Sequence, residues 1–435
     1  MNKHRIQARV RVRVPRTVVV FVMCLGGASA FPQDAINESV AVDSGRRVRK
    51  EAIDRNLYNL KAGPVLMRFD AMMGFEFNDN PHLEDDPNEV DFAFHPQVDV
   101  AALWALNPRN AFALNLGVGY MKYVNNTDLD HVIVAPSSEL AFDIYAGDFS
   151  INFHERVSYT QNPFSDPTVS GTGDFGGLEN TVGTRVDWDL NRLVFSLGYD
   201  HYNFISMNSG VSESLQRGSS TNAFVEDVQD RSAELVYGRV GAKLSPEVTT
   251  GLEAGASFTD YSSEFFHDNT QFSIGPFVEV LVSRDLRTRA AGGYVLSEFD
   301  DEGISSAPNS VDDFYAQLSL DHQLSQSIDH RLALGREATS GAEAELVTYW
   351  YARYENNWRF SQYMTLHSSL LYENGRERSG VAEKFWRAGG SVGVTVPLSR
   401  KLNVTAHYHF IYKDSDKVNR NYLQNVAALG FRYIF

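Results

Sequence analysis

The sequence predicts an all-β fold, a transmembrane antiparallel up-and-down β-barrel of about 18 strands in the bacterial outer membrane. Three observations support this prediction. Apolar and polar residues alternate from Ala62 onward, short and long connections alternate between the resulting segments, and the last segment carries aromatic residues at every second position up to Phe435. In a strand such alternation gives one apolar face and one polar face, which suits lipid outside a barrel and water inside it.

The first thirty residues have the pattern of a secretory signal peptide. A basic segment precedes an apolar core over residues 17–27, and Ala28-Ser29-Ala30 supplies the small residues of a cleavage site before Phe31. The apolar run is too short for a transmembrane anchor. The only cysteine, Cys24, lies inside this segment, and Met23 before it is larger than the small residue that a lipoprotein signal prefers, so we expect no lipid anchor. The mature chain then has no cysteine for disulfides or thiolate metal sites.

Composition and charge exclude other classes of protein. Past residue 30 no run approaches the ~20 apolar residues of a helical span, which excludes a helical membrane protein. Removing the six basic residues of the signal segment from the 39 in the chain leaves 33 against 55 acidic residues, a formal charge of −22. We therefore expect no nucleic-acid partner. Residues 31–61 are polar and mixed, and they are predicted to form a periplasmic extension before a barrel over residues 62–435.

Most of the predicted strands exceed the ~9–11 residues that a tilted strand needs to cross the hydrocarbon. In 401–413, for example, Leu402 and Val404 share one face and His407 lies on the other. A soluble sandwich would also alternate, but eighteen long strands fit poorly into two packed sheets. The predicted strands are 62–77, 89–106, 111–124, 131–145, 149–160, 178–190, 193–204, 232–244, 248–261, 270–282, 286–299, 311–324, 328–338, 343–358, 362–373, 381–398, 401–413 and 420–435.

Every second connection is tight, and those between are mostly longer and polar. In outer-membrane barrels the short turns lie in the periplasm and the long loops lie outside the cell. An even number of strands then returns both ends of the barrel to the periplasm. The short turns are 107–110, 146–148, 191–192, 245–247, 283–285, 325–327, 360–361 and 399–400, and the long loops are 78–88, 125–130, 161–177, 205–231, 262–269, 300–310, 339–342, 374–380 and 414–419.

Three prolines fall early in the second strands of predicted hairpins. They are Pro96, Pro136 and Pro276. Proline cannot donate a hydrogen bond to a strand ladder, so each is expected to mark a β-bulge or the start of a strand.

The final predicted strand places Phe431, Tyr433 and Phe435 on one apolar face. One interpretation is an ordinary core strand. The favoured one is a closing strand whose alternating aromatics resemble the sorting signal of bacterial outer-membrane barrels. These three residues are then the predicted signal for the barrel-assembly machinery, and lipid and lipopolysaccharide are the expected surroundings.

Inward positions of the predicted strands carry both signs of charge. A barrel of eighteen strands is wide enough for an aqueous channel unless a loop folds into it, and the alternative is a lumen filled by salt bridges. The candidate lumen-lining residues are Arg156, Arg185, Asp187, Asp189, Arg239, Glu253, Glu279, Arg287, Arg289, Tyr349, Tyr351, Arg353, Glu355, Arg387, His407 and His409, together with Asp200, Lys243, Arg331 and Glu345.

The sequence contains no convincing catalytic, metal or cofactor motif. Residues 171–176 match G-x-G-x-x-G, but no helix is predicted after them, so we interpret them as a flexible loop. His407 and His409 share a strand face and could hold a metal, yet without further ligands lumen lining is favoured. Asp187 and Asp189 are likewise interpreted as lumen charges rather than a catalytic pair. We predict that the chain is not an enzyme and has no cofactor.

The predicted exterior loops are acidic. Asp79, Asp85 and Asp86 lie in the first loop, and Asp300 and Asp301 lie in the sixth. Carboxylates suit Ca²⁺ and Mg²⁺, which bridge lipopolysaccharide molecules, but an ordinary solvated loop is the favoured interpretation.

The first predicted hairpin contains a recognisable pattern. The run Phe75-Glu76-Phe77-Asn78-Asp79-Asn80 is followed by Asp91, by Pro96 and by an alternating strand that ends in Asn107-Pro108-Arg109-Asn110. This pattern resembles the putative β-barrel porin 2 family. The local similarity covers roughly residues 70–125. The resemblance implies an outer-membrane channel of a kind often linked to exopolysaccharide secretion in Gram-negative bacteria. It also implies a polysaccharide and periplasmic export components as partners.

Two functions therefore compete. The family resemblance favours a conduit for polysaccharide export, whereas the barrel alone equally predicts a porin for small solutes. Inward Tyr349, Tyr351 and Arg353 suit either function, as do Glu355 and Asn357 on the same strand. The acidic exterior opposes the entry of polyanions. We predict an export conduit for a neutral or cation-screened polysaccharide, with a porin as the alternative.

Overall fold

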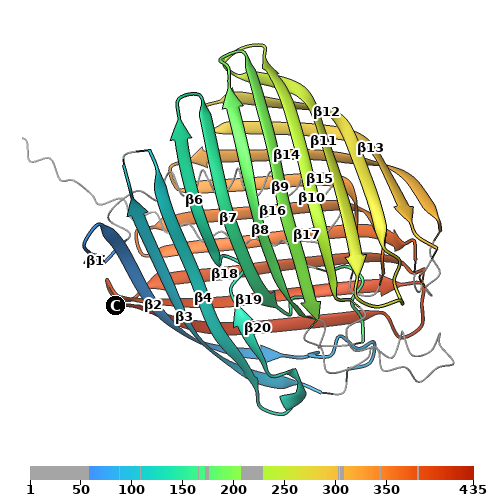
Figure 1. Ribbon diagram of the computed structural model, residues 1–435. Helices are drawn as coiled ribbons and strands as arrows, with labels where there is room; N and C mark the ends of the chain where they lie inside the picture. Colours follow the sequence, from blue (N-terminus) through green and yellow to red (C-terminus); the bar gives the residue numbers. More distant parts are fainter. Residues whose placement is uncertain are drawn as a thin grey trace, which may run out of the picture.

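In the computed structural model the strands wind obliquely around one barrel (Figure 1). The structure describes residues 58–87, 89–107, 109–164, 166–171, 176–206, 229–301, 303, 308–341, 344–379 and 382–435. The predicted signal peptide and nearly all of the predicted extension therefore lie outside the described residues. Within these ranges, no helix is long and apolar enough to cross a membrane.

Twenty strands and one short 3-10 helix occur in the described part of the chain, and neighbouring strands pair antiparallel. They are β1 (Leu60–Ala62), β2 (Val65–Asn78), β3 (Asp91–Ala105), β4 (Ala111–Tyr123), η2 (Thr127–Leu129), β5 (His131–Val134), β6 (Glu139–Ala146), β7 (Phe149–Thr160), β8 (Gly177–Asp189), β9 (Leu193–Ser206), β10 (Arg231–Lys243), β11 (Val248–Tyr261), β12 (Asn269–Ser283), β13 (Leu286–Phe299), β14 (Ser310–Ser325), β15 (Ile328–Thr339), β16 (Val347–Ser361), β17 (Met364–Glu377), β18 (Lys384–Pro397), β19 (Leu402–Ser415) and β20 (Tyr422–Ile434).

The wall is a closed barrel of eighteen strands, as predicted. β2 and β20 close it, with Asp70 opposite Ile434 at one end of their pairing and Asn78 opposite Val426 at the other. β5 and β6 both pair with β4 and β7, so together they form one strand of the wall. Among the described strands, β1 pairs only with the start of β2. Closure leaves no exposed strand edge in the hydrocarbon, where an unpaired backbone would be costly.

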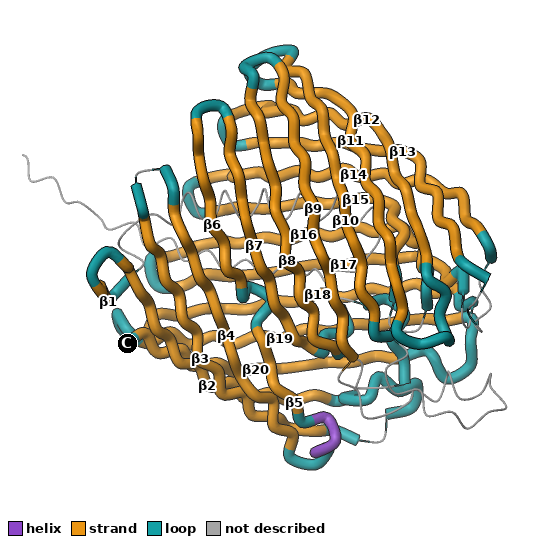
Figure 2. Tube along the Cα trace, viewed as in Figure 1, coloured by secondary structure: helices purple, strands orange, loops and turns teal. Residues whose placement is uncertain are grey.

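The predicted strand boundaries are wrong at a few places. Ala62 ends β1, and the wall begins at Val65, because Gly63 adopts a positive φ of 60° and turns the chain back. β16 continues to Ser361, so the turn predicted at 360–361 lies at 362–363. Figure 2 shows the compact turns gathered at one end of the barrel and the longer connections at the other. We refer to them as the short-turn end and the long-loop end.

The three prolines interrupt the strand ladders in two ways. At Pro96, pairing between β3 and β4 stops after Phe94 and resumes at Gln97 in the same register, and Pro276 leaves a similar gap between β12 and β13. These two positions are neither bulges nor strand starts, contrary to the prediction, because the missing N–H removes a ladder bond without shifting the register. Pro136 lies in the break between β5 and β6, where the register against β4 shifts as expected for a bulge.

Side-chain alternation divides the wall into an outer and an inner face. Leu197, Leu252 and Leu370 are among the large apolar side chains exposed on the outer face. On the inner face, charged side chains such as Asp200 and Glu373 are fully buried against their neighbours. The described part of the barrel therefore has its apolar surface outside and a packed polar layer inside, the reverse of a soluble barrel.

Candidate functional site

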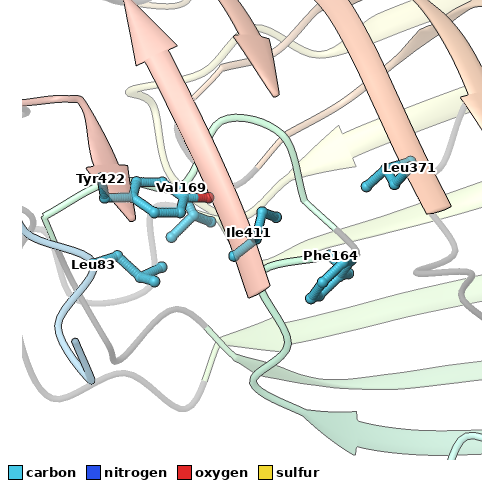
Figure 3. Close-up of a cluster of buried hydrophobic side chains, with 6 residues drawn as sticks. All are labelled: Leu83, Phe164, Val169, Leu371, Ile411 and Tyr422. Carbon is cyan, nitrogen blue, oxygen red and sulfur yellow. The ribbon is translucent and has the colours of Figure 1, made fainter. Parts of the chain in front are cut away.

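The connection between β7 and β8 folds into the barrel at the long-loop end. We call its described part, residues 161–164 and 166–171, the inward loop. Thr168 and Val169 have no exposed surface. Figure 3 shows Val169 beside Tyr422 of β20, with Leu83 of the β2–β3 connection and Ile411 of β19 on either side. The prediction of a polar exterior loop at 161–177 is therefore wrong for these residues. Burial of apolar side chains such as Val169 favours the inward position.

Three cations, two on wall strands and one in the β19–β20 connection, bind backbone carbonyl groups of the inward loop. Arg387 Nη1 donates to the carbonyl oxygens of Pro163, at 2.6 Å, and Asp166, at 2.7 Å. Lys413 Nζ and Arg420 Nη2 donate to the carbonyl of Thr168 at 3.0 and 2.7 Å. The loop has no strand partner here, so these cations supply the hydrogen bonds that its buried carbonyl groups require.

Three carboxylates balance these cations. Arg387 lies 2.5 Å from Glu373, Arg420 lies 3.3 Å from Glu377, and Glu383 lies 3.1 Å from Lys413 and 2.7 Å from Arg420. No side chain of this set is more than 3% exposed. We call the six residues the ion cluster. Because every charge is both buried and paired, loss of a partner would leave a buried charge with less compensation, which is destabilising.

Glu383 belongs to the connection between β17 and β18 rather than to a strand. Burial alone would raise the pKa of its carboxyl group, but the Lys413 and Arg420 cations outweigh burial and hold this pKa below its usual range. Glu383 is therefore ionised at neutral pH, and the ion cluster stays balanced.

Gly171 is the last residue of the inward loop. Its backbone φ is +68°, a left-handed conformation that glycine adopts without a Cβ clash, and its N–H donates to the carbonyl of Leu83 at 2.8 Å. Residues 172–175 of the glycine-rich motif lie outside the described residues. Gly171 itself is thus a fixed turn that ties the inward loop to the β2–β3 connection.

Five predicted lumen residues form a chain of ion pairs across β10 to β13. Glu279 contacts Arg239, lies 2.8 Å from Arg287 and lies 3.6 Å from Arg289, which also contacts Glu253. The Arg239 guanidinium lies 4.3 Å from the centre of the Phe277 ring. Sequence reasoning selected all five charged residues, because they lie at alternate positions on neighbouring strands.

Near the short-turn end the predicted lumen charges form more exposed pairs. Asp189 lies 2.6 Å from Lys243, and Arg331 lies 2.6 Å from Asp321. Asp189 is 56% exposed and Arg331 is 52% exposed. Deeper in the wall, Arg185 lies 2.9 Å from Asp187 and Arg156 lies 3.7 Å from Glu139.

The inward face of β16 connects the wall to the ion cluster. Arg353 lies 3.1 Å from Glu373, and its guanidinium lies 4.6 Å from the centre of the Tyr351 ring. Tyr349 is buried and donates its hydroxyl to Glu337. Glu355 lies farther along the same face and pairs in register with Arg331. This strand therefore extends the ionic contacts of the inward loop into the middle of the barrel.

His407 and His409 lie on the inner face of β19, with ring centres 5.4 Å apart. His409 also makes an edge-to-face contact with Phe164 of the inward loop, at 5.4 Å between ring centres. Within the described ranges, no group of three or more His, Cys, Asp or Glu side chains is arranged to hold a metal ion. Two of the other predicted inward residues, Asp200 and Glu345, each lie beside a buried histidine. Asp200 lies 3.1 Å from His154, and Glu345 lies 2.9 Å from His267.

Sequence reasoning missed most of the ion cluster. It selected Arg387 but not Glu373, Glu377, Glu383 or Arg420, and it gave Lys413 no role beyond its strand face. One usable signal was present: charges of opposite sign fall near the long-loop ends of the last four predicted strands. The loop that buries them carries no periodic pattern, so its place inside the barrel could not be predicted.

Comparison with known proteins finds a family and several solved barrels. Residues 60–435 match the family described as "Putative beta-barrel porin 2". No curated protein matches the chain. Among solved structures, Pseudomonas aeruginosa OpdK with vanillate is 13% identical, with a TM-score of 0.45, over 85% of this chain and 99% of that chain. Pseudomonas aeruginosa OccK2 (OpdF) in complex with glucuronate is 9% identical, with a TM-score of 0.45, over 85% of this chain and 98% of that chain.

Proposed function

Because this chain belongs to the putative beta-barrel porin 2 family and forms a closed outer-membrane barrel, we propose that it is a channel for small polar solutes. The inward loop is the observation that carries this proposal. It narrows the lumen at the long-loop end, and it is bound to the wall by buried charges. The proposal replaces polysaccharide export, the function that the family resemblance favoured, with the porin alternative, and it assigns no catalytic role.

The strength of the loop contacts supports a standing constriction rather than a gate that a polymer could push aside. A hydrogen bond to a charged group typically contributes about 1.5–3 kcal/mol. Here backbone carbonyls of the inward loop accept such bonds from three buried cations, and the loop also buries Val169 and Phe164. A threading polysaccharide would have to break several of these contacts together, whereas a small solute passes beside the loop.

The hydrated charges near the short-turn end support a polar cargo. Asp189, Lys243, Asp321 and Arg331 are all partly exposed. Paired charges of both signs keep a passage wet and bind polar solutes weakly, and weak binding lets solutes leave as well as enter.

Conductance and permeation of the purified barrel test the proposal. Single barrels in planar bilayers should conduct ions steadily, and proteoliposomes should admit monosaccharides while excluding longer oligosaccharides. A strain lacking the protein should keep its surface polysaccharide. Loss of that polysaccharide, together with a barrel that shows no size-limited permeation, would restore the export function and reject the porin.

A further inference from the structure

A groove crosses the outer wall of the barrel over the long-loop ends of β15 to β19. Its volume is about 540 Å³. Its lining includes three cations, Arg336, Arg376 and Lys384, and two indole rings, Trp350 and Trp386. Alternation along β17 and β18 puts Arg376 and Trp386 on the same outer face as exposed Leu370 and Val392. We call it the rim groove.

Two cations of the rim groove lie opposite each other on neighbouring strands. Arg376 of β17 pairs in register with Lys384 of β18, and both side chains are exposed. Among the described residues, neither forms an ion pair within 4 Å. Like charges directly opposite each other destabilise a sheet, so this position is unfavourable unless an anion lies between them.

Two further arginines lie close to this pair, and they share one carboxylate, Asp313. Arg378 lies two positions after Arg376, and burial together with repulsion from Arg376 lowers the pKa of its guanidinium. Arg336 is held against Asp313 at 2.5 Å, with its guanidinium 4.3 Å from the centre of the Phe314 ring. Both Nη atoms of Arg336 donate to Asp313 and the carbonyl of Phe314, so Arg376 and Lys384 are the cations of the groove that remain for a ligand.

Carboxylates also line the rim groove, but their contacts are local. Asp414 accepts a hydrogen bond from the Trp386 indole at 2.7 Å, and Asp416 accepts one from the backbone N–H of Lys384 at 2.8 Å. They retain free acceptor positions for hydroxyl groups. The rim groove therefore combines cations for a phosphate with acceptors for a sugar.

An aromatic band marks the depth of the rim groove in the membrane. Trp386 lies 5.2 Å from Tyr412 and 6.4 Å from Tyr372, measured between ring centres, on the outer face. Outer-membrane barrels carry such bands where the hydrocarbon meets the headgroups. Arg376 and Lys384 lie beyond the band toward the long loops, so they are at headgroup level. The long-loop end faces the cell exterior in barrels of this kind, which places the groove in the outer leaflet.

We propose that the rim groove binds the phosphorylated sugar headgroup of an outer-leaflet glycolipid. A phosphate lies between Arg376 and Lys384 and relieves their repulsion. Sugar hydroxyls donate to Asp414, and the acyl chains run down the exposed apolar face past Tyr372 and Leu370. This site does not depend on what the channel transports.

The test compares two double variants of the purified barrel, Arg376→Ala/Lys384→Ala and Arg400→Ala/Lys401→Ala. The second removes the same charge from the β18–β19 turn at the other end of the barrel. Native mass spectrometry with added lipid A measures binding. The rim variant should bind on the order of thirtyfold more weakly, because each basic residue near an anionic headgroup contributes about a factor of five. The turn variant should bind like the parent barrel.

The lipid probes define the chemistry of the site. Lipid A with its phosphates removed should bind the parent barrel as weakly as intact lipid A binds the rim variant. Equal binding of both lipids, equal loss in both variants, or equally tight binding of phosphatidylglycerol would each overturn the proposal. Heat-modifiable migration on gels identifies folded barrel, and Arg376→Lys, which keeps the charge, should retain most binding if the double variant folds poorly.

Discussion

The two ends of the lumen use the same kinds of ion pair in opposite surroundings. In the ion cluster beneath the inward loop, Glu383 and Lys413 are completely buried, whereas Asp189 and Arg331 near the short-turn end are more than half exposed. An exposed pair contributes about 0–1 kcal/mol, but removing one partner from a buried pair costs about 3–5 kcal/mol. The difference shows that charges buried beneath the inward loop hold the structure together, while charges that the loop does not cover remain available to solutes.

Replacing an anchoring cation should give the largest effect. Arg387→Met leaves buried Glu373 with Arg353 as its one remaining partner among the described residues, and it removes the donors to Pro163 and Asp166. We expect the binding of the inward loop to the barrel wall to weaken by about 3–5 kcal/mol, so that the loop leaves the lumen. Single-channel recording should show a larger and noisier conductance, and liposome swelling should admit larger sugars.

The matched control for that variant is Arg331→Met, which removes the same group from an exposed pair. It should leave the conductance noise and the size limit unchanged. A parent-like conductance in Arg387→Met would show that the inward loop does not narrow the channel.

Acid should weaken the ion cluster through Glu383. Because the pKa of this carboxyl group is held low in the folded barrel, its ionised form stabilises the cluster above the usual carboxyl range, and the stabilisation is lost as the pH falls through the lowered value. Conductance recorded from pH 7 downward should become noisy only below about pH 4. Glu383→Gln should be noisy already at pH 7, with a loss of about 1–3 kcal/mol. A pH profile shared by the variant and the parent would exclude Glu383 as the titrating group.

Crowding the inward loop should have a smaller effect. A Cβ added at Gly341 would lie 2.3 Å from the Thr168 side chain, so Gly341→Ala has to displace the loop at a cost of about 1–3 kcal/mol. Gly238→Ala is the control, since nothing lies within 4 Å of its added Cβ. Limited proteolysis of the two variants should cut the β7–β8 connection faster in Gly341→Ala alone. Equal rates would indicate that Thr168 is not tightly seated.

The smallest effect on stability is expected at the short-turn end. Arg331→Gln breaks an exposed pair with Asp321 and should change the unfolding free energy by about 0–1 kcal/mol. It should nevertheless shift the reversal potential measured in a salt gradient in the direction of greater cation selectivity, because the substitution removes a hydrated positive charge from the passage. An unchanged reversal potential would place Arg331 outside the ion path.

The barrel was predictable because lipid imposes a period of two on every strand. Residues such as Leu402, Val404 and His407 alternate along β19 as the sequence indicates, and the same rule gave the number of strands and their closure. The boundaries at Ala62 and Ser361 were less certain, since turn geometry rather than alternation decides them.

The position of the inward loop could not be predicted in the same way. Val169 meets Leu83 and Tyr422, which are distant in the sequence, and Glu383 belongs to a connection that has no periodic pattern. Loop positions depend on such long-range contacts. The inward positions of Arg387 and His409 were predictable from alternation, but the contacts that the loop makes with them were not.

The inward loop also spans the seam where the barrel closes. β2 and β20 pair through nine residue pairs, whereas β19 and β20 pair through twelve. Beyond the seam, Gly171 donates to the carbonyl of Leu83 on the β2 side, and the hydroxyl of Ser170 donates to the carbonyl of Arg420 on the β20 side. The surface that binds the inward loop is therefore complete only after β2 and β20 have paired. The inward loop can therefore narrow the lumen only after the barrel has closed. A barrel whose β2–β20 seam is still open lacks the surface that holds the loop in the lumen.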